Sequence, residues 1–136
     1  MRNPNKQVRK AVVDALKTAT GLAVYENLVP IDLPLNSQYI LVNSQSKRQI
    51  ERSKSCWDWE SSFNIDIHSV NEKGFSHSVT VDDIEELVLN AISSLKVDTW
   101  HVKGREFVDS ISNVIELPDH TVNRIVVVYN LWLAEQ

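Results

Sequence analysis

CWDWESSFNIDIHS, the stretch from Cys56 to Ser69, alternates between apolar and polar side chains over most of its length. Successive side chains of a β-strand point to opposite faces of a sheet, so this alternation predicts a strand with one apolar and one polar face. The apolar face holds Trp57, Trp59, Phe63, Ile65 and Ile67, and the polar face holds Asp58, Glu60, Ser62, Asn64, Asp66 and His68. The sequence therefore predicts a sheet in the middle of the chain.

A helix and further extended chain are predicted before this strand. Apolar residues at helical spacing from Val8 to Ala19 predict a helix that Asn3 or Asn5 caps and Gly21 ends. The segments that follow are, in order, a short strand-like stretch from Leu22 to Glu26, an extended proline-containing connection from Asn27 to Asn36, and a buried strand from Gln38 to Ser44. Ser44 to Ser55 is polar and charged apart from Ile50, and we interpret it as a mobile loop.

A second helix and two more strands are predicted after a turn at Asn71 to Gly74. Thr80 and Asp83 resemble a capping box, and an apolar stripe at helical spacing continues to Leu95. Next comes a strand from Thr99 to Val108, which is predicted to bend near Gly104 and which residues up to Ile115 could extend. A turn from Leu117 to His120 and a last strand from Thr121 to Leu133 follow. The last strand is apolar on both faces, which is typical of a strand that is covered on both sides.

These elements predict an α+β fold in which an antiparallel sheet of about four strands carries two helices on one face. A length of 136 residues is usual for one domain, so residues 1–136 are predicted to form a single domain. If both helices cover the same face, apolar residues of the last strand are exposed on the other, and such a patch marks a subunit interface. We therefore expect an oligomer in which Tyr129, Leu131 and Leu133 contact another subunit.

The composition is that of a globular protein, with 43% hydrophobic and 24% charged residues, and it is too apolar for a disordered chain. Met1 to Lys10 holds no signal-peptide core, and no run approaches the roughly 18 apolar residues that a membrane helix needs, so we expect a soluble protein. Cys56 is the only cysteine and has no partner for an internal disulfide, which fits a reducing compartment.

The net charge of −4 is unevenly distributed along the chain. Residues 1–54 carry nine Lys and Arg against four Asp and Glu, a net of +5, whereas residues 55–136 carry five against fourteen, a net of −9. Two interpretations are open. In the first, copies or partners meet through faces of opposite sign, and in the second, the two halves interleave in space and the asymmetry cancels.

No catalytic motif accompanies the central strand. Asp58, Glu60, Asp66 and His68 share its polar face, and a small metal-dependent nuclease is one interpretation of them. They extend over about 30 Å of strand, so only neighbouring pairs could share an ion, and a solvated outer face is favoured. Only three glycines occur, which removes phosphate-cradling loops from consideration. We predict no catalytic residue, no metal site and no cofactor, and therefore no enzyme.

Four basic residues, Lys47, Arg48, Arg52 and Lys54, lie within eight positions of the polar loop. They would contact either nucleic acid, through its phosphates, or another protein. The neighbouring tryptophans belong to the apolar face of the strand, where packing in the core explains them better than stacking on bases. A solvated or partner-binding loop is therefore favoured over direct DNA contact.

Several short segments follow one another along the chain in an order that is typical of one protein family. They are Leu22-Ala23-Val24-Tyr25, Val29-Pro30, Tyr39-Ile40-Leu41-Val42, Phe63 to Ser69, Ala91-Ile92-Ser93-Ser94-Leu95, Trp100, and Arg124 to Leu133. In this order of elements, nearly the whole chain resembles the small tail-completion, or tail-terminator, proteins of long-tailed bacteriophages. The resemblance implies an α/β unit that closes into a ring, commonly hexameric, caps the tail tube and joins it to the head connector.

The resemblance also implies a set of partners. It implies a homo-oligomer that contacts the tail-tube protein and the head connector or adaptor proteins. The lumen of this oligomer would lie close to DNA, and no membrane would be involved. The protein would be assembled in the host cytoplasm and would end up in the virion. It transfers no active-site residue. By position, Ser44 to Ser55 matches the variable loop of the family, so its basic residues are expected to contact neighbouring subunits or the tube. A cytoplasmic α+β adaptor module unrelated to phage is the alternative function, with the nuclease as the third.

Overall fold

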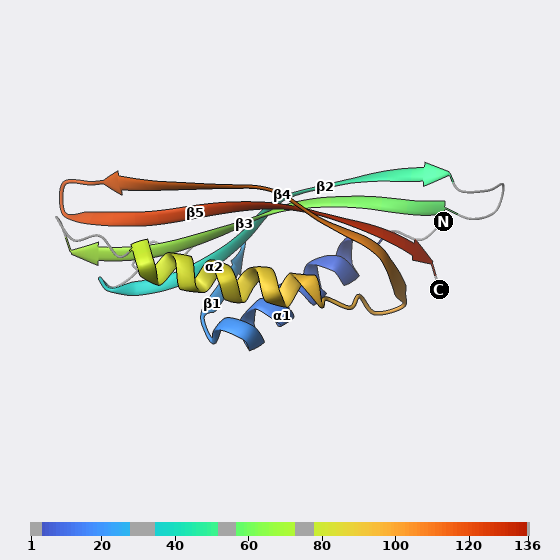
Figure 1. Cartoon of the computed structure of the whole chain (residues 1–136), viewed down its shortest axis with the longest axis horizontal. Helices are drawn as coiled ribbons and strands as arrows, with labels where there is room; N and C mark the ends of the chain where they lie inside the picture. Colours follow the sequence, from blue (N-terminus) through green and yellow to red (C-terminus); the bar gives the residue numbers. More distant parts are fainter. Residues whose placement is uncertain (1–3, 28–34, 52–56, 73–77, 136) are drawn as a thin grey trace.

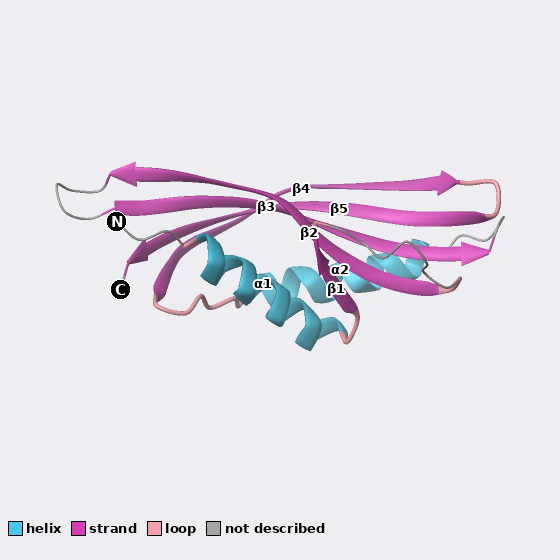
Figure 2. Cartoon of the chain, turned by 180° about the vertical axis from the view of Figure 1, so that it is seen from behind, coloured by secondary structure: helices cyan, strands magenta, loops and turns pink. Residues whose placement is uncertain are grey.

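The chain folds into a layer of β-sheet with a layer of helix on one of its faces (Figure 1). The computed structural model describes residues 4–27, 35–51, 57–72 and 78–135. The helices are α1 (Asn5–Thr20) and α2 (Ser78–Ser93), and the strands are β1 (Ala23–Glu26), β2 (Ser37–Glu51), β3 (Trp57–Glu72), β4 (Trp100–Glu116) and β5 (His120–Glu135). The fold class is α+β, as the sequence predicts, and both helices lie on the same side of the sheet (Figure 2).

The sheet contains five strands in the order β1-β2-β3-β5-β4. Neighbouring strands are antiparallel except β1 and β2, which run parallel from the pair Ala23↔Tyr39 to the pair Glu26↔Val42. The prediction of an antiparallel sheet is therefore confirmed for every pair of neighbours except β1 and β2, and the sheet has five strands instead of about four. The short segment after α1 joins the sheet as an edge strand, and β2 starts at the end of the sheet where β1 also starts.

Two of the strands are longer than their predicted cores. β2 continues from Ser44 to Glu51, which the sequence analysis assigns to a mobile loop. Backbone pairing with β3, from Ser46↔Ser62 to Glu51↔Trp57, holds this segment in the sheet. The loop prediction is wrong here because a polar strand has no hydrophobic alternation by which its sequence could be recognised. β4 includes the extension beyond Val108, and its register shifts next to Gly104, where a bend is predicted.

The two helices lie where the sequence predicts them, but their first residues differ from the predicted ones. Pro4 is the N-cap of α1 and makes no side-chain capping bond, so the predicted asparagine cap is absent: Asn5 is the first helical residue, and Asn3 lies outside the described residues. α2 starts at Ser78, two positions before Thr80. Gly21 ends α1 as predicted, because its φ of 68° favours glycine and its N–H donates to the Lys17 carbonyl at 2.9 Å.

The core lies between the helices and one face of β3 and β5. Most of its sheet side comes from Phe63, Ile65 and Ile67 of β3 and Ile125, Val127, Tyr129, Leu131 and Leu133 of β5, with Val24, Ile40, Val42, Trp59 and Trp100 beside them. From the helix layer, α1 contributes Val8, Val12 and Leu16, and α2 contributes Val81, Val88 and Ile92. The Arg105 guanidinium of β4 donates to the Leu95 carbonyl at 2.5 Å, which satisfies one of the carbonyl groups left unpaired beyond the end of α2.

Tyr129, Leu131 and Leu133 are buried in this core. The expectation that they contact another subunit therefore does not fit the structure. Both faces of β5 are apolar, as predicted, but the helices cover the face that holds these three side chains. The opposite face holds Val126 and Val128.

Replacing Ile92 by alanine is expected to lower the free energy of unfolding by about 2–5 kcal/mol, because a fully buried side chain leaves a cavity when it is truncated. Leu87 lies on the same helix with 44% of its surface exposed, so Leu87→Ala should lower the free energy of unfolding by less than about 1 kcal/mol. Urea denaturation of both variants measures the difference. Equal losses would contradict the orientation of α2 described above.

Candidate functional site

The face of the sheet opposite the helices is left uncovered by the described helices (Figure 2). Residues paired directly across two strands share a face, so the register identifies its members. Along the centre of the sheet, Val126, Val128 and Trp132 of β5 lie opposite Asp66, Asn64 and Glu60 of β3. We call this surface the bare face. The β5 members are half-buried, in contrast to the buried β5 residues beneath the helices.

A cluster of charged and aromatic side chains occupies the bare face. Asp66 is only 3% exposed and accepts a hydrogen bond from Arg124 Nη2 at 2.8 Å, and His68 Nε2 lies 3.9 Å from the same Oδ2 atom. The His68 ring stacks on Tyr39 with ring centroids 4.7 Å apart, and Tyr39 meets Tyr25 edge-on with centroids 6.0 Å apart. These contacts connect side chains from β1, β2, β3 and β5 on a face that carries no helix.

Opposing effects set the pKa of Asp66. Burial raises the pKa of this carboxyl, but the nearby His68 ring, the hydrogen bond from Arg124 and the positive charge of Arg124 together lower it further than burial raises it. Burial also raises the pKa of the neighbouring Tyr39 hydroxyl. Asp66 is therefore a charged, buried group whose counter-ion lies directly beside it.

A second ion pair crosses the bare face nearer to the start of β3. Lys103 Nζ donates to Asp58 Oδ2 at 2.8 Å. Lys103 is the extra residue where the register of β4 shifts, and such a bulge redirects a side chain relative to the regular strand. The expectation of a solvated polar face is thus wrong for Asp58 and Asp66, because both carboxylates are buried and paired with cations from β4 and β5.

These ion pairs bear on the metal and nuclease interpretations. Each of the two aspartates that would supply metal ligands is already engaged by a lysine or an arginine. In the part of the chain that the structure describes, no group of three or more His, Cys, Asp and Glu side chains is placed to hold a metal ion. The arrangement holds charge in place within the sheet.

β4 is an edge strand with two contrasting halves. From Trp100 to Asp109, two register shifts interrupt its pairing with β5, and charged residues such as Lys103 and Glu106 occur along it. From Ser110 to Ile115, the pairing is regular and every residue is uncharged. Bulges and charges are the features that keep sheet edges from pairing with other chains, and the second half has neither. We call Ser110–Ile115 the open segment of β4.

Exposed apolar side chains follow the same strand. Ile111 and Val114 of the open segment are 57% and 51% exposed. Further exposed large apolar residues on or next to β4 are Phe107, Val108, Ile115 and Leu117. Ile111 and Ile115 lie on the bare face and Phe107 and Val114 on the other, so both faces of this edge strand expose large apolar side chains, which mark an interaction site when they gather in one part of a surface.

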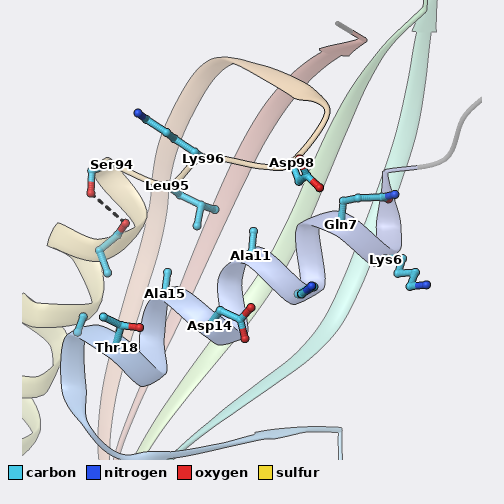
Figure 3. A pocket seen from close by; sticks show the side chains of 13 residues that line it. Lys6, Gln7, Ala11, Asp14, Ala15, Thr18, Ser94, Leu95, Lys96 and Asp98 are labelled. Carbon is cyan, nitrogen blue, oxygen red and sulfur yellow. Dashed lines mark hydrogen bonds between the residues drawn. The ribbon is translucent and has the colours of Figure 1, made fainter.

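A groove of about 770 Å³ runs between α1 and the end of α2 (Figure 3). Small side chains such as Ala11 and Ala15 line it, together with charged residues of both signs, among them Lys6, Lys96 and Asp98. The groove thus has a mixed lining of small and charged side chains.

The structure separates the residues that were predicted to contact partners. Lys47 and Arg48 belong to β2 by their backbone, with side chains outside the described part of the chain. Arg52, Lys54 and Cys56 lie outside the described residues altogether. The predicted β5 contacts lie in the core, as shown above. The exposed apolar surface that sequence reasoning missed is on β4, where the alternation is visible in the sequence but its position at a sheet edge is not.

Among the residues that the structure describes, no helix is long and apolar enough to cross a membrane. No protein-family model and no curated protein matches the sequence.

A chain in the solved virion of a native gene transfer agent particle has a similar fold. The two chains align with a TM-score of 0.68 and 17% sequence identity over 98% of this chain and 99% of that chain. The solved structure of the bacteriophage SPP1 gp17 protein aligns with a TM-score of 0.42 and 18% identity over 90% of this chain and 88% of that chain. The first of these comparisons shows that this chain has the fold of a virion component.

Asp66→Asn is expected to reduce the acid sensitivity of the fold. Because the folded-state pKa of Asp66 is lowered, its charged form stabilises the fold above the unfolded pKa of about 3.9, and this contribution is lost as the pH falls through the lower folded pKa. Urea denaturation from about pH 7 down to about pH 2 should therefore give a shallower loss of stability for the variant, which starts from a lower value. Asp83→Asn, at an exposed position of α2, is the control. A variant profile as steep as that of the wild type would refute the role of the pair.

Proposed function

We propose that this chain is a structural virion protein that forms a ring at the head–tail junction of a phage-like particle, ends the growth of the tail tube and joins the tube to the head connector. The observation that carries the proposal is the fold shared, over nearly the whole length of both chains, with a chain of a gene transfer agent virion. The resemblance of the sequence to tail-terminator proteins supports the same role.

The surface of the molecule supports a protein that works in an assembly. A chain that acted alone would be expected to protect its sheet edges and to bury its large apolar side chains. Here the open segment of β4 has neither bulge nor charge, and Ile111 and Val114 are exposed on it. Such a surface is suited to contact between subunits.

We assign the bare face to the inner wall of the ring, with the helices outside. Asp58 and Asp66 on this face are paired with Lys103 and Arg124, respectively. Paired carboxylates repel a passing nucleic acid less than free ones would, because each is neutralised by an adjacent cation. A lumen that DNA passes without being bound fits this distribution of charge. The tail-tube protein and the head connector or adaptor proteins are the partners that the role requires, with assembly in the host cytoplasm.

The purified protein is expected to form rings, or to cap isolated tail tubes, when it is viewed by negative-stain electron microscopy. Light scattering should give a mass that is a multiple of the 15.5 kDa chain. Tail tubes incubated with the protein should stop growing at the capped end, in contrast to tubes incubated with buffer. A protein that stays monomeric and leaves the tubes uncapped would exclude the proposed role.

A further inference from the structure

The open segment of β4 has an exposed backbone edge that another strand could pair with. The side of β4 that faces away from β5 meets no other described strand, which leaves this edge open to pairing with another chain, although the Ser110 N–H already donates to Asp109 Oδ1 at 2.8 Å. Ile111 shares a face with Val126 of β5, whereas Val114 shares the opposite face with Asn123, so apolar surface is exposed on both sides of the segment. A regular, uncharged edge of this kind pairs readily with a strand from another chain.

The same sheet offers a second open edge. β1 pairs with β2 only from Tyr39 to Val42. Residues Asn43–Glu51 of β2 therefore have β3 on one side and no described strand on the other. The register of β2 with β3 shifts between Asn43 and Ser46 and is regular from Ser46 to Glu51, and we call Ser46–Glu51 the open segment of β2. The molecule thus presents two unpaired edges on opposite sides of one sheet.

The directions of these two edges are compatible. β2, β3, β5 and β4 alternate in direction, so β2 and β4 run opposite ways. A second copy in the same orientation would therefore place its β2 antiparallel to β4 of the first. The open segment of β4 lies at the end of the sheet where β2 begins, and that of β2 lies at the other end (Figure 1). Neighbouring copies would consequently be staggered along the strands, and such a stagger is what closed sheets require.

Charge distinguishes this contact from the alternatives. The strand order keeps β1 and β2 of the basic N-terminal half on one side of the sheet and β3, β5 and β4 of the acidic half on the other, so the halves do not interleave within the sheet. From Glu106 to Asp119, the chain carries four acidic residues and no lysine or arginine, whereas Lys47 and Arg48 belong to β2. A contact between β4 and β2 joins opposite charges, and a contact between two copies of β4 joins like charges.

We infer that the open segment of β4 pairs, antiparallel, with the open segment of β2 in a second copy of this chain, so that the sheet continues from one subunit to the next. The inference rests on the proposed function, for which it names the contact between subunits. The contact is heterologous, and repetition of a heterologous contact gives a ring when the rotation closes.

The first experiment places charge on the open segment of β4. Ile111→Lys with Val114→Lys should reduce the assembled fraction, measured by light scattering and negative stain, at least about tenfold, because two ammonium groups would have to be desolvated in the contact. Leu87→Lys is the matched control, since it adds a charge at an exposed apolar position of α2 and should assemble like the wild type. Circular dichroism and thermal unfolding establish that both variants fold.

The second experiment mixes two variants that are blocked at different edges. Lys47→Glu with Arg48→Glu reverses the charge of the β2 edge and should also prevent assembly. Each variant keeps one intact edge, so a mixture of the two should form a 1:1 dimer with twice the mass of the 15.5 kDa chain, whereas each alone stays monomeric. Dimers formed by the β2 variant alone would instead indicate a contact between two copies of β4, and would overturn the inference.

The outcomes separate this inference from the proposed function. If the wild type forms rings that cap tubes and the β4 variant does so too, the inference fails while the function stands. If the mixed variants dimerise but the wild type neither forms rings nor caps tubes, the edge contact stands while the function fails. A wild type that stays monomeric at every concentration, with no dimer in the mixture, overturns both.

Discussion

A β-strand rises about 3.3 Å per residue and an α-helix about 1.5 Å, and this difference controls how much of the sheet the helices protect. The 16 residues of β5 span about 53 Å, whereas the 16 residues of α2 span about 24 Å. The helix layer therefore covers the middle of one face and leaves the strand ends and the other face to be protected differently. The bare face is protected by ion pairs and stacked rings, and the open segment of β4 has no such protection within the described chain.

The ion pair of Asp66 and Arg124 has a role beyond its own energy. A buried ion pair adds little net stability compared with apolar residues of similar size, because both charges lose their hydration. Apolar residues on the bare face would enlarge a surface that no helix covers. Asp66 lies opposite Val126, and Arg124 lies opposite His68, so the two charges meet diagonally. A slip by one residue would move one strand's set of side chains to the other face and leave each charge unpaired, and the pair therefore helps to fix the register of β3 and β5.

Sequence patterns predict those helices and strands in which the alternation of apolar and polar residues shows which side chains are buried. The alternation around Phe63 and Ile65 identifies β3, and the apolar stripe through Val88 and Ile92 identifies α2. The pairing of β1 with β2 was not predictable in this way, because a four-residue segment contains no signal for its partner. The exposed surface was assigned to the wrong strand for a related reason: both faces of β5 are apolar, and only the tertiary arrangement decides which face the helices cover. The ion pairs between strands likewise depend on a register that the sequence pattern leaves open.

Continuation of the sheet between subunits constrains where the helices lie. Two adjacent helices, each about 10–12 Å in diameter, occupy about 20–24 Å, and five strands about 4.8 Å apart occupy nearly the same width. When a second copy extends the sheet at β4, the helix layers of the two copies therefore meet. A sheet that curved toward its helices would force these layers into each other, whereas curvature away from them separates the layers. A closed ring built from this contact consequently has α1 and α2 on its outside and the bare face, with Asp66 and Arg124, toward its lumen.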